Sequence, residues 1–282
     1  MQHTTSTISS ADGTTLFTRR WTPDVPTIAH LFIVHGVLEH SGRYAYTASH
    51  LMQHGIQVHA LDLRGHGQSE GPRATVSSFA EYSDDVAMAL VPLLAESGDV
   101  PVYLMGHSMG GLVAARLTVD HGLRGIAGLI LSSPALAVDA PAPLRALAPA
   151  IARWLPRVPV SKLDLSLLSH DPAIVRARRE DPLCIHSSVR AALGYEIIRS
   201  IEHVRLRVDA FTAPLYVFHG TADAVTMPEG SEWIIENAPS DDKTLKLYEG
   251  FYHETLNELG RDTVLADLTD WILARVRQPD AA

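Results

Sequence analysis

Three residues that lie far apart in the chain have the side chains that an acyl-transfer reaction needs. Ser108 lies within the segment GHSMGG, residues 106–111, whereas Asp223 and His253 come much later. Such a reaction uses a hydroxyl nucleophile, an imidazole that takes its proton, and a carboxylate that fixes the imidazole tautomer. We therefore predict a catalytic triad in the chain order nucleophile, acid, base.

The segment around Ser108 has the pattern of a sharp turn between a strand and a helix. A short apolar run, residues 102–105, precedes it, and a helical pattern from about Met109 to residue 121 follows it. Glycines on both sides permit the strained backbone of such a turn, which lifts the serine hydroxyl above the sheet. The N-terminus of the helix directs backbone N–H groups towards negative charge that develops beside the serine.

Strand-like and helix-like segments alternate through most of the chain and predict the scaffold that positions these residues. After a hairpin with its turn at residues 11–13, this alternation favours the α/β class, a mostly parallel central sheet with helices on both faces. The predicted serine, aspartate and histidine each follow a strand, in the order typical of the α/β-hydrolase fold. We expect strands at residues 29–34, 56–61, 101–105, 128–131, 214–219 and 244–248, and helices at residues 44–54, 79–96, 109–121, 233–237 and 263–277.

The alternation stops at residue 135 and resumes after residue 201. Residues 135–201 are rich in Ala, Leu, Pro and Arg and show no strand pattern, so we predict an inserted helical cap, or lid. The hydrolase core would then comprise residues 1–134 and 202–282. Apolar residues recur at helical spacing in the first part of the cap, which Pro149 and Pro156 interrupt. These side chains either pack on the core or line an acyl channel and contact a lipid surface.

Composition and charge describe a globular protein without the marks of a nucleic-acid partner. The 282 residues include 46% hydrophobic residues, and 23 Lys and Arg against 32 Asp and Glu give a net charge of -9. The only cysteine, Cys184, excludes an internal disulfide and fits a reducing compartment. Residues 1–10 lack a signal-peptide pattern, and no apolar run approaches the roughly 20 residues of a spanning helix. We expect a cytoplasmic protein, with peripheral association of the cap with a membrane left open.

Several short motifs are spread over nearly the whole chain. They are GHSMG at residues 106–110, DLRGHG at 62–67 with Ser69, EHSGRY at 39–44, DPL at 181–183, GTAD at 220–223 and YEGFYH at 248–253. Together these motifs resemble those of the monoacylglycerol lipase family. The resemblance implies an α/β-hydrolase with a lid that cleaves a fatty acid from glycerol.

The same resemblance implies roles for residues around the triad. The oxyanion hole would consist of the backbone N–H groups of Val37 and Met109, which fits the two fixed donors that a tetrahedral intermediate needs. Glu39 and Arg43 would lie around the glycerol end of the substrate. An ion pair between Glu39 and Arg43 that only braces the loop would explain the same residues equally well.

Two positions depart from the family pattern. Leu38 stands where family members commonly have glycine, so the oxyanion loop is expected to be stiffer or differently shaped. Arg178 stands where a tyrosine is common in the lid. With Arg176 and Arg179 beside it, Arg178 either favours an anionic head group, because guanidinium pairs with phosphate in a bidentate manner, or belongs to a solvated helix face.

We therefore predict a serine carboxylester hydrolase that cleaves monoacylglycerols through an acyl-enzyme, with no cofactor or metal. Lysophospholipids and short soluble esters remain alternative substrates, and transfer of the acyl group to an alcohol would use the same residues. A ligand-binding protein that keeps this fold without turnover is an alternative of another class, against which the intact triad argues. The sequence leaves open the acyl length, the preferred position on glycerol, the lid conformation and the oligomeric state.

Overall fold

An eight-stranded sheet forms the centre of the molecule. The computed structural model describes residues 2–122, 124–138 and 142–276. The strand order is β1-β2-β4-β3-β5-β6-β9-β10; β2 runs antiparallel to both of its neighbours, and the pairs from β4 to β10 are parallel. The predicted mostly parallel sheet is therefore confirmed. The strands are β1 (Gln2–Ser9), β2 (Thr15–Thr22), β3 (Ala29–Val34), β4 (Ile56–Leu61), β5 (Val102–His107), β6 (Ile126–Ser132), β9 (Leu215–Gly220) and β10 (Lys243–Tyr248).

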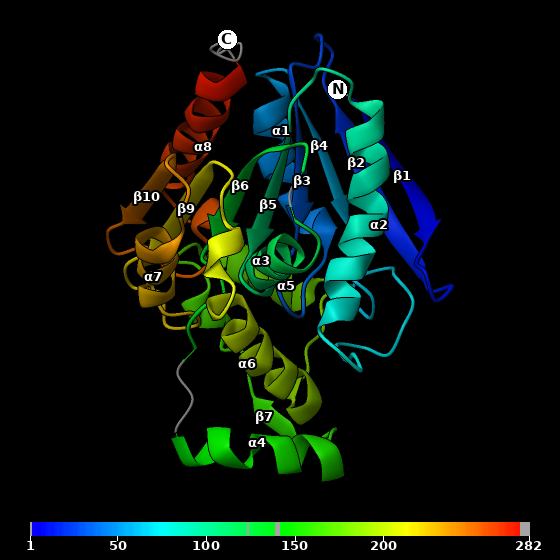
Figure 1. Ribbon diagram of the computed structural model, residues 1–282, viewed down its shortest axis with the longest axis vertical. Helices are drawn as coiled ribbons and strands as arrows, with labels where there is room; N and C mark the ends of the chain where they lie inside the picture. Colours follow the sequence, from blue (N-terminus) through cyan, green and yellow to red (C-terminus); the bar gives the residue numbers. More distant parts are fainter. Residues whose placement is uncertain (1, 123, 139–141, 277–282) are drawn as a thin grey trace.

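Helices cover both faces of the sheet, as Figure 1 shows. One face packs against α1 and α8, and the other packs against α2, α3 and α7. Strand β3 explains this arrangement, because all six of its side chains are buried and its five apolar side chains are divided between the two hydrophobic cores. The helices are α1 (Ala45–Met52), α2 (Ala80–Glu96), α3 (Met109–His121), α7 (Glu229–Asn237) and α8 (Arg261–Val276), with short 3-10 turns η1 (Ser41–Tyr44), η3 (Val208–Ala210) and η4 (Thr255–Asn257). Arg277, the last residue of the expected terminal helix, lies outside the described residues.

The carboxyl ends of the parallel strands lie level with one another. His107 at the end of β5 pairs with Ser132 of β6, which in turn pairs with Phe218 near the end of β9. Since parallel strands with matching ends deliver their following loops to one edge of the sheet, the loops after these strands meet there. The segments that meet at this edge come from a stretch between Val34 and Glu254, which are 220 residues apart in the sequence.

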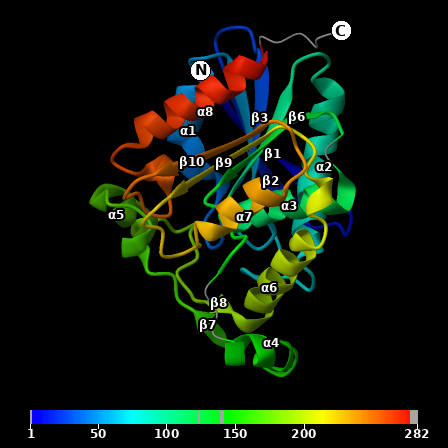
Figure 2. The same ribbon diagram turned by 60° about the vertical axis from the view of Figure 1, so that its left-hand side comes forward.

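The segment between β6 and β9 forms the cap, which lies at the opposite end of the molecule from most of α8 (Figures 1 and 2). Its last helix, α6, packs against both α3 of the core and α4 of the cap. The expected boundary at residue 201 falls inside α6. The division into core and cap therefore stays a proposal, and we move its second boundary to the end of α6. The elements are α4 (Ala142–Trp154), β7 (Pro159–Ser161), η2 (Leu165–Leu167), α5 (Pro172–Glu180), β8 (Val189–Arg190) and α6 (Ala191–Arg205).

Two features of the cap differ from the sequence prediction. No strand was expected, yet β7 and β8 form a short antiparallel ladder. Their lengths of three and two residues are too short to produce a recognisable alternation of polar and apolar residues. Pro149 was expected to interrupt the first cap helix, yet α4 continues through it and ends at Trp154.

The cap has two parts with different surroundings. We call residues 142–162 the cap tip and residues 165–185 the cap base. The base makes hydrogen bonds and ion pairs with the core, whereas the tip presents several apolar side chains to solvent. Among the tip residues whose side chains are described, 146–162, the large exposed apolar ones are Leu147, Trp154, Leu155, Val158 and Val160.

Candidate active site

Ser108 lies on the sharp turn between β5 and α3. Its backbone has φ 55° and ψ −122°, a left-handed conformation that non-glycine residues rarely adopt. A Cβ atom at Gly106 would lie 2.2 Å from the carbonyl oxygen of Gly110, and one at Gly110 would lie 2.2 Å from the carbonyl oxygen of Val34. Glycine is therefore required at both positions for the strand, the turn and the helix to approach each other.

Asp223 and His253 lie on the loops after β9 and β10 and are hydrogen bonded to each other. His253 Nδ1 lies 2.7 Å from Asp223 Oδ2, and the His253 ring lies 4.8 Å from the ring of His107, the residue before Ser108. The structure thus brings the three predicted triad residues to one place. In the described part of the chain the Ser108 hydroxyl has no hydrogen-bond partner, so it is free to turn towards a substrate carbonyl.

The environment of Asp223 keeps its carboxylate ionised. Although burial opposes ionisation, hydrogen bonds from His219 and His253 hold the pKa of Asp223 far below its ordinary value. The other oxygen, Oδ1, accepts the backbone N–H groups of Val225 at 2.7 Å and Thr226 at 3.1 Å. Together, five hydrogen bonds to the two carboxylate oxygens of Asp223 orient the group so that Oδ2 faces His253.

The two predicted oxyanion donors lie beside Ser108 without other partners. Among the residues that the structure describes, neither the N–H of Val37 nor that of Met109 donates a hydrogen bond, and both residues line a cavity together with Ser108. A Cβ atom at Gly36 would lie 3.2 Å from Ser108 Cβ, so the loop before Val37 runs directly past the serine. Two unpaired donors next to a nucleophile are what a developing oxyanion requires.

Leu38 adopts a positive φ angle, a backbone conformation that favours glycine. Its φ angle is +61°, its side chain is buried, and its carbonyl oxygen accepts the N–H of Ile185 from the cap base at 3.0 Å. For a residue with a Cβ atom this conformation costs about 1–2 kcal/mol. The oxyanion loop thus keeps a glycine-like turn, and packing of the leucine side chain and the hydrogen bond to the cap hold it.

Glu39 and Arg43 form a buried ion pair, which agrees with the bracing alternative. Glu39 Oε1 also accepts the N–H of Gly36 at 2.6 Å and the hydroxyl of Tyr44 at 3.0 Å. Arg43 donates to both oxygens of Glu254, at 2.7 and 2.6 Å. Burial raises the pKa of Glu254, but the neighbouring Arg43 outweighs this effect and lowers the pKa to about 2. Contact of Glu39 or Arg43 with substrate stays a prediction.

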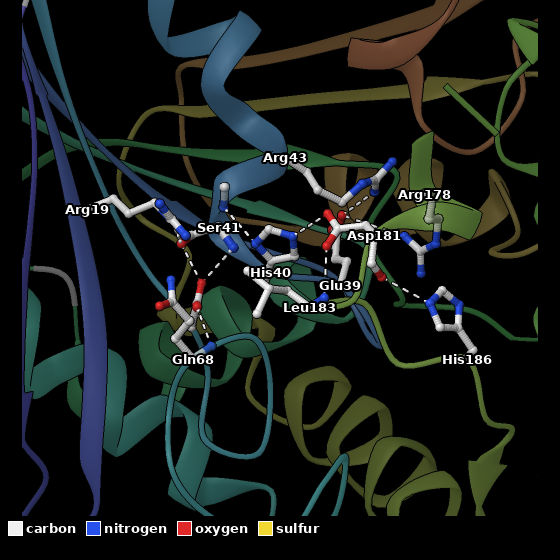
Figure 3. A network of polar contacts seen from close by, with 12 residues as sticks. Arg19, Glu39, His40, Ser41, Arg43, Gln68, Arg178, Asp181, Leu183 and His186 are labelled. Atoms are coloured by element: carbon white, nitrogen blue, oxygen red, sulfur yellow. Dashed lines mark hydrogen bonds and ion pairs between the residues drawn. The ribbon is translucent and has the colours of Figure 1, made fainter. Parts of the chain in front are cut away.

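Arg178 is buried, with 4% of its side chain exposed, so it does not belong to a solvated helix face. Its guanidinium lies 3.2 Å from Glu254, 3.7 Å from Glu39 and 3.4 Å from the carbonyl oxygen of Val37. Figure 3 shows Arg178 near Glu39 and Arg43. The neighbouring Arg176 and Arg179 are exposed, as the solvated-face interpretation predicted for all three arginines. Helix α5 turns only Arg178 towards the core, which periodicity alone could not indicate.

A cavity of about 680 Å³ connects Ser108 to the cap tip. It begins at the predicted nucleophile and oxyanion loop and continues between α4, β7 and α6. Its size and largely apolar lining are typical of a site that binds a small apolar molecule. The apolar side chains along it include Val37, Met109, Val138, Ile151, Val160, Leu163, Leu167, Val189, Ile197, Ile198, Val225 and Met227.

His40, Asp181 and Cys184 are the described side chains whose arrangement comes nearest to a metal site. Their ligand atoms lie within 4.8 Å of one another. However, His40 Nε2 binds Asp181 at 2.8 Å while its Nδ1 accepts the N–H of Gly42, so both ring nitrogens have partners. Burial raises the pKa of the Cys184 thiol to about 12, which disfavours the thiolate that a metal ion needs. The cluster instead ties the oxyanion loop to the cap base.

Sequence reasoning did not identify two residues that contact the predicted triad. His219 is fully buried, and its Nε2 lies 2.9 Å from Asp223 Oδ2 while its Nδ1 lies 2.7 Å from the hydroxyl of Ser231. The hydroxyl of Thr226 lies 3.2 Å from His253 Nδ1. A histidine at the end of an apolar strand was the available signal for His219, whereas nothing in the sequence pattern pointed to Thr226.

Comparison with known proteins gives consistent matches over most of the chain. A family model described as "Serine aminopeptidase, S33" matches residues 26–260. The monoglyceride lipase of Rattus norvegicus is 35% identical over 275 residues, which cover 95% of this chain and 89% of that protein. The monoacylglycerol lipase of Mycolicibacterium smegmatis is 34% identical over 262 residues, covering 91% and 92%. The crystal structure of Paleococcus ferrophilus monoacylglycerol lipase superposes with a TM-score of 0.79 at 30% identity, covering 98% and 100%.

Proposed function

The chain belongs to the monoacylglycerol lipase family of α/β-hydrolases, and on that premise we propose that it hydrolyses monoacylglycerols to a fatty acid and glycerol. The observation that supports this most directly is the position of Ser108. It lies on a strained turn at the inner end of an apolar cavity, beside two unpaired backbone donors and near the Asp223–His253 pair. The reacting ester carbonyl would lie at Ser108 and the acyl chain in the cavity.

The reaction begins when Ser108 attacks the ester carbonyl. His253 takes the hydroxyl proton as general base, and its Nδ1–H remains bonded to Asp223, which stabilises the positive charge that forms on the imidazole. The carbonyl oxygen becomes an oxyanion that accepts the N–H groups of Val37 and Met109. Removing one such donor from a comparable enzyme raises the barrier by about 3 kcal/mol.

The tetrahedral intermediate then collapses to an acyl-enzyme. His253 gives its proton to the glycerol oxygen, so the C–O bond breaks and glycerol leaves. Water, activated by the same histidine, attacks the acyl-enzyme; the fatty acid is released and Ser108 regains its proton. Burial lowers the pKa of the adjacent His107 to about 4, so His107 stays neutral and does not compete for the proton.

A chain-length series tests this function. Purified protein would be assayed with 1-monoacylglycerols of increasing acyl length and with a short p-nitrophenyl ester, alongside Ser108→Ala. We expect turnover of long-chain monoacylglycerols, and a loss of at least about 10³-fold in kcat for Ser108→Ala on every substrate. Chromatography of the products with and without added alcohol distinguishes hydrolysis from acyl transfer.

The outcomes separate the alternatives. Activity confined to the short ester would replace the lipase by an esterase, and a preference for lysophospholipids would replace the substrate class. Equal rates for wild type and Ser108→Ala would exclude Ser108 as the nucleophile, and absent turnover of every ester by wild type would favour a binding protein. The buried position of Arg178 argues against its recognising a phosphate head group.

The cap tip is proposed to contact the lipid surface that holds the substrate. No helix in the described part of the chain meets the length and hydropathy that crossing a bilayer requires. Instead Trp154 is 75% exposed and Leu147 57% exposed on α4, next to the cationic side chains of Arg153 and Arg157. Exposed apolar and aromatic side chains beside cations are typical of helices that lie at a membrane interface.

Vesicle flotation tests this contact. Wild-type protein is expected to float with vesicles of anionic phospholipid, and Trp154→Ala is expected to float less because it removes the largest exposed apolar side chain. Val91→Ala on α2, which also removes an exposed apolar side chain, is the control and should behave as wild type. Equal flotation of wild type and Trp154→Ala would contradict this role of the tip.

A further inference from the structure

Arg178 connects three segments that are distant in the sequence. It comes from α5 in the cap base, and its guanidinium reaches the oxyanion loop and the residue after His253. Nη1 lies 3.2 Å from Glu254 Oε1 and 3.7 Å from Glu39 Oε2, while Nη2 donates to the Val37 carbonyl at 3.4 Å. Both terminal nitrogens therefore have protein partners.

The cluster around Arg178 is balanced in charge. Glu39 and Glu254 contribute two negative charges, and Arg43 and Arg178 contribute two positive charges, all on buried or nearly buried side chains. The neighbouring cations hold the pKa of Glu39 well below its ordinary value despite burial. Removing one member leaves an uncompensated charge in a site where water cannot screen it.

Arg178 also holds the backbone of the loop that supplies one oxyanion donor. It binds the carbonyl of Val37, whose N–H is unpaired in the described structure and lines the cavity beside Ser108. The next carbonyl, that of Leu38, accepts the N–H of Ile185 from the same cap base. Two successive carbonyls of the oxyanion loop are thus fixed by the cap. Because Leu38 is strained at a φ angle of +61°, the loop needs such contacts to keep this conformation.

We propose that Arg178 is a positioning residue: it couples the cap base to the oxyanion loop and to the His253 loop, and so sets the geometry of the catalytic centre without contacting substrate. This inference rests on the proposed serine hydrolase chemistry but not on the identity of the lipid. It assigns the arginine a role different from head-group recognition, because its guanidinium is buried and occupied.

The charge of Arg178 also affects the proton acceptor. If Arg178 is removed, Glu39 and Glu254 share Arg43 as their remaining cation, and the net negative charge left beside His253 favours the protonated imidazole. The protonated form cannot act as the base, so activity should be lost at a higher pH than in wild type. The charged and titratable groups that contact His253 or adjoin it in the chain are Asp223, His107 and Glu254. Glu254 in turn pairs with Arg43 and Arg178, which both also contact Glu39.

The test uses the short p-nitrophenyl ester, whose hydrolysis depends on the catalytic centre and not on lipid recognition. Arg178→Met is expected to lower kcat by about 10- to 100-fold through a displaced oxyanion loop, with KM changed by less than about twofold. Arg179→Met, on the exposed side of the same helix, is the matched control and should have wild-type kcat and KM. Wild-type kcat for Arg178→Met would overturn the inference. A rise of KM for monoacylglycerol alone would also overturn it, because this is the signature of a substrate ligand.

The pH profile separates positioning from a general loss of structure. In Arg178→Met, the acid limb of the kcat/KM profile is expected to lie at higher pH than in wild type. In the double variant that combines Arg178→Met with Glu254→Gln, one charge of each sign is removed, so the acid limb should return towards its wild-type position. An acid limb that stays in place in Arg178→Met would overturn the electrostatic part of the inference.

Arg178→Lys keeps the test decisive if the methionine variant fails to fold. The ammonium group keeps the charge but cannot reach Glu254 and the Val37 carbonyl together, so kcat should fall several-fold with the acid limb unchanged. Wild-type kcat in Arg178→Lys would refute positioning of the loop. Failure of the proposed lipase function would appear as absent monoacylglycerol turnover in wild type and would leave these short-ester results intact.

Discussion

The two parts of the cap are attached to the molecule in contrasting ways. The base makes hydrogen bonds to the oxyanion loop and to the His253 loop. Asp181 binds His40, which follows Glu39 in the oxyanion loop, and the carbonyl of Leu168 accepts the N–H of Glu254, the residue after His253. His170, just before α5, lies with its Nδ1 2.9 Å from Glu258 Oε1 and adds a hydrogen bond to the core. The tip packs on α6 and leaves its apolar side chains exposed.

This difference separates two requirements of the proposed hydrolysis at a lipid surface. The catalytic centre needs fixed donors and acceptors, which the base stabilises with buried charges and backbone hydrogen bonds. Substrate entry needs an apolar surface and freedom to move, which a tip with few polar contacts permits. Substitutions in the base should therefore change the stability of the protein and kcat, whereas substitutions in the tip should change the access of the substrate to the cavity.

The largest expected effect comes from Glu39 in the cluster that the base covers. Glu39→Gln removes one negative charge from a buried network and leaves the positive charges of Arg43 and Arg178 with Glu254 as their one remaining carboxylate in the cluster, so unfolding should require about 3–5 kcal/mol less free energy. Denaturant unfolding measures this change. The control Asp84→Asn breaks the exposed Asp84–His121 pair and should cost less than about 1 kcal/mol. Similar losses in the two variants would contradict the special role of the base.

The contribution of Glu254 should depend on pH. Its pKa is lowered from an ordinary value of 4.5 to about 2, so its stabilising effect is complete above pH 4.5 and disappears as the pH falls towards 2. The difference in unfolding free energy between wild type and Glu254→Gln should therefore shrink over this window. Glu96→Gln, at an exposed carboxylate, should give a small difference without this trend. A difference independent of pH between 4.5 and 2 would be inconsistent with the buried ion pair.

A smaller effect, on the choice between long and short substrates, is expected where α6 faces the tip across the cavity. A Cβ atom at Gly194 would meet Val160 Cγ2 at 3.2 Å, so Gly194→Leu narrows the cavity. Long-chain monoacylglycerol turnover should fall by about tenfold or more, while the short ester is hydrolysed at nearly the wild-type rate. Ala192→Leu on the same helix, outside the cavity lining, is the control. Equal losses on long and short substrates would show that the cavity is not the acyl channel.

The smallest effect on stability is expected in the tip itself. Leu147→Ser replaces an exposed side chain of α4 and should change the free energy of unfolding by less than about 0.5 kcal/mol. Short-ester kinetics should also stay at wild-type values. A clear loss of stability would mean that the tip packs more firmly than its exposure indicates.

The catalytic core was predictable because its chemistry and its scaffold constrain residue type and order together. Ser108 and Asp223 each follow a buried strand that was recognisable as a run of mostly apolar residues, whereas His253 follows β10, a partly exposed strand with alternating polar and apolar residues. Level strand ends then bring the three loops to one edge, as a parallel sheet requires. The glycines at 106 and 110 pointed to the turn for the steric reason that the structure now gives.

The cap was less predictable because its details depend on contacts between distant segments. Three arginines in α5 have similar local sequence, and only the packing of that helix decides that Arg178 faces Glu254 while Arg179 faces solvent. The β7–β8 ladder is shorter than any period that a sequence pattern could reveal. For Leu38, nothing in the sequence indicated that the residue adopts a positive φ angle held by contacts with the cap base, and a stiffer or differently shaped oxyanion loop stays a prediction.

The buried Cys184 makes the protein convenient for measuring cap motion by site-specific labelling. It is the only cysteine in the chain, and its burial and raised pKa make its thiol unreactive towards maleimides near neutral pH. A cysteine introduced at exposed Arg157 in the tip would then be the single reactive thiol. A nitroxide or fluorophore attached there would report the distance and mobility of the tip in solution and on vesicles without prior removal of native cysteines.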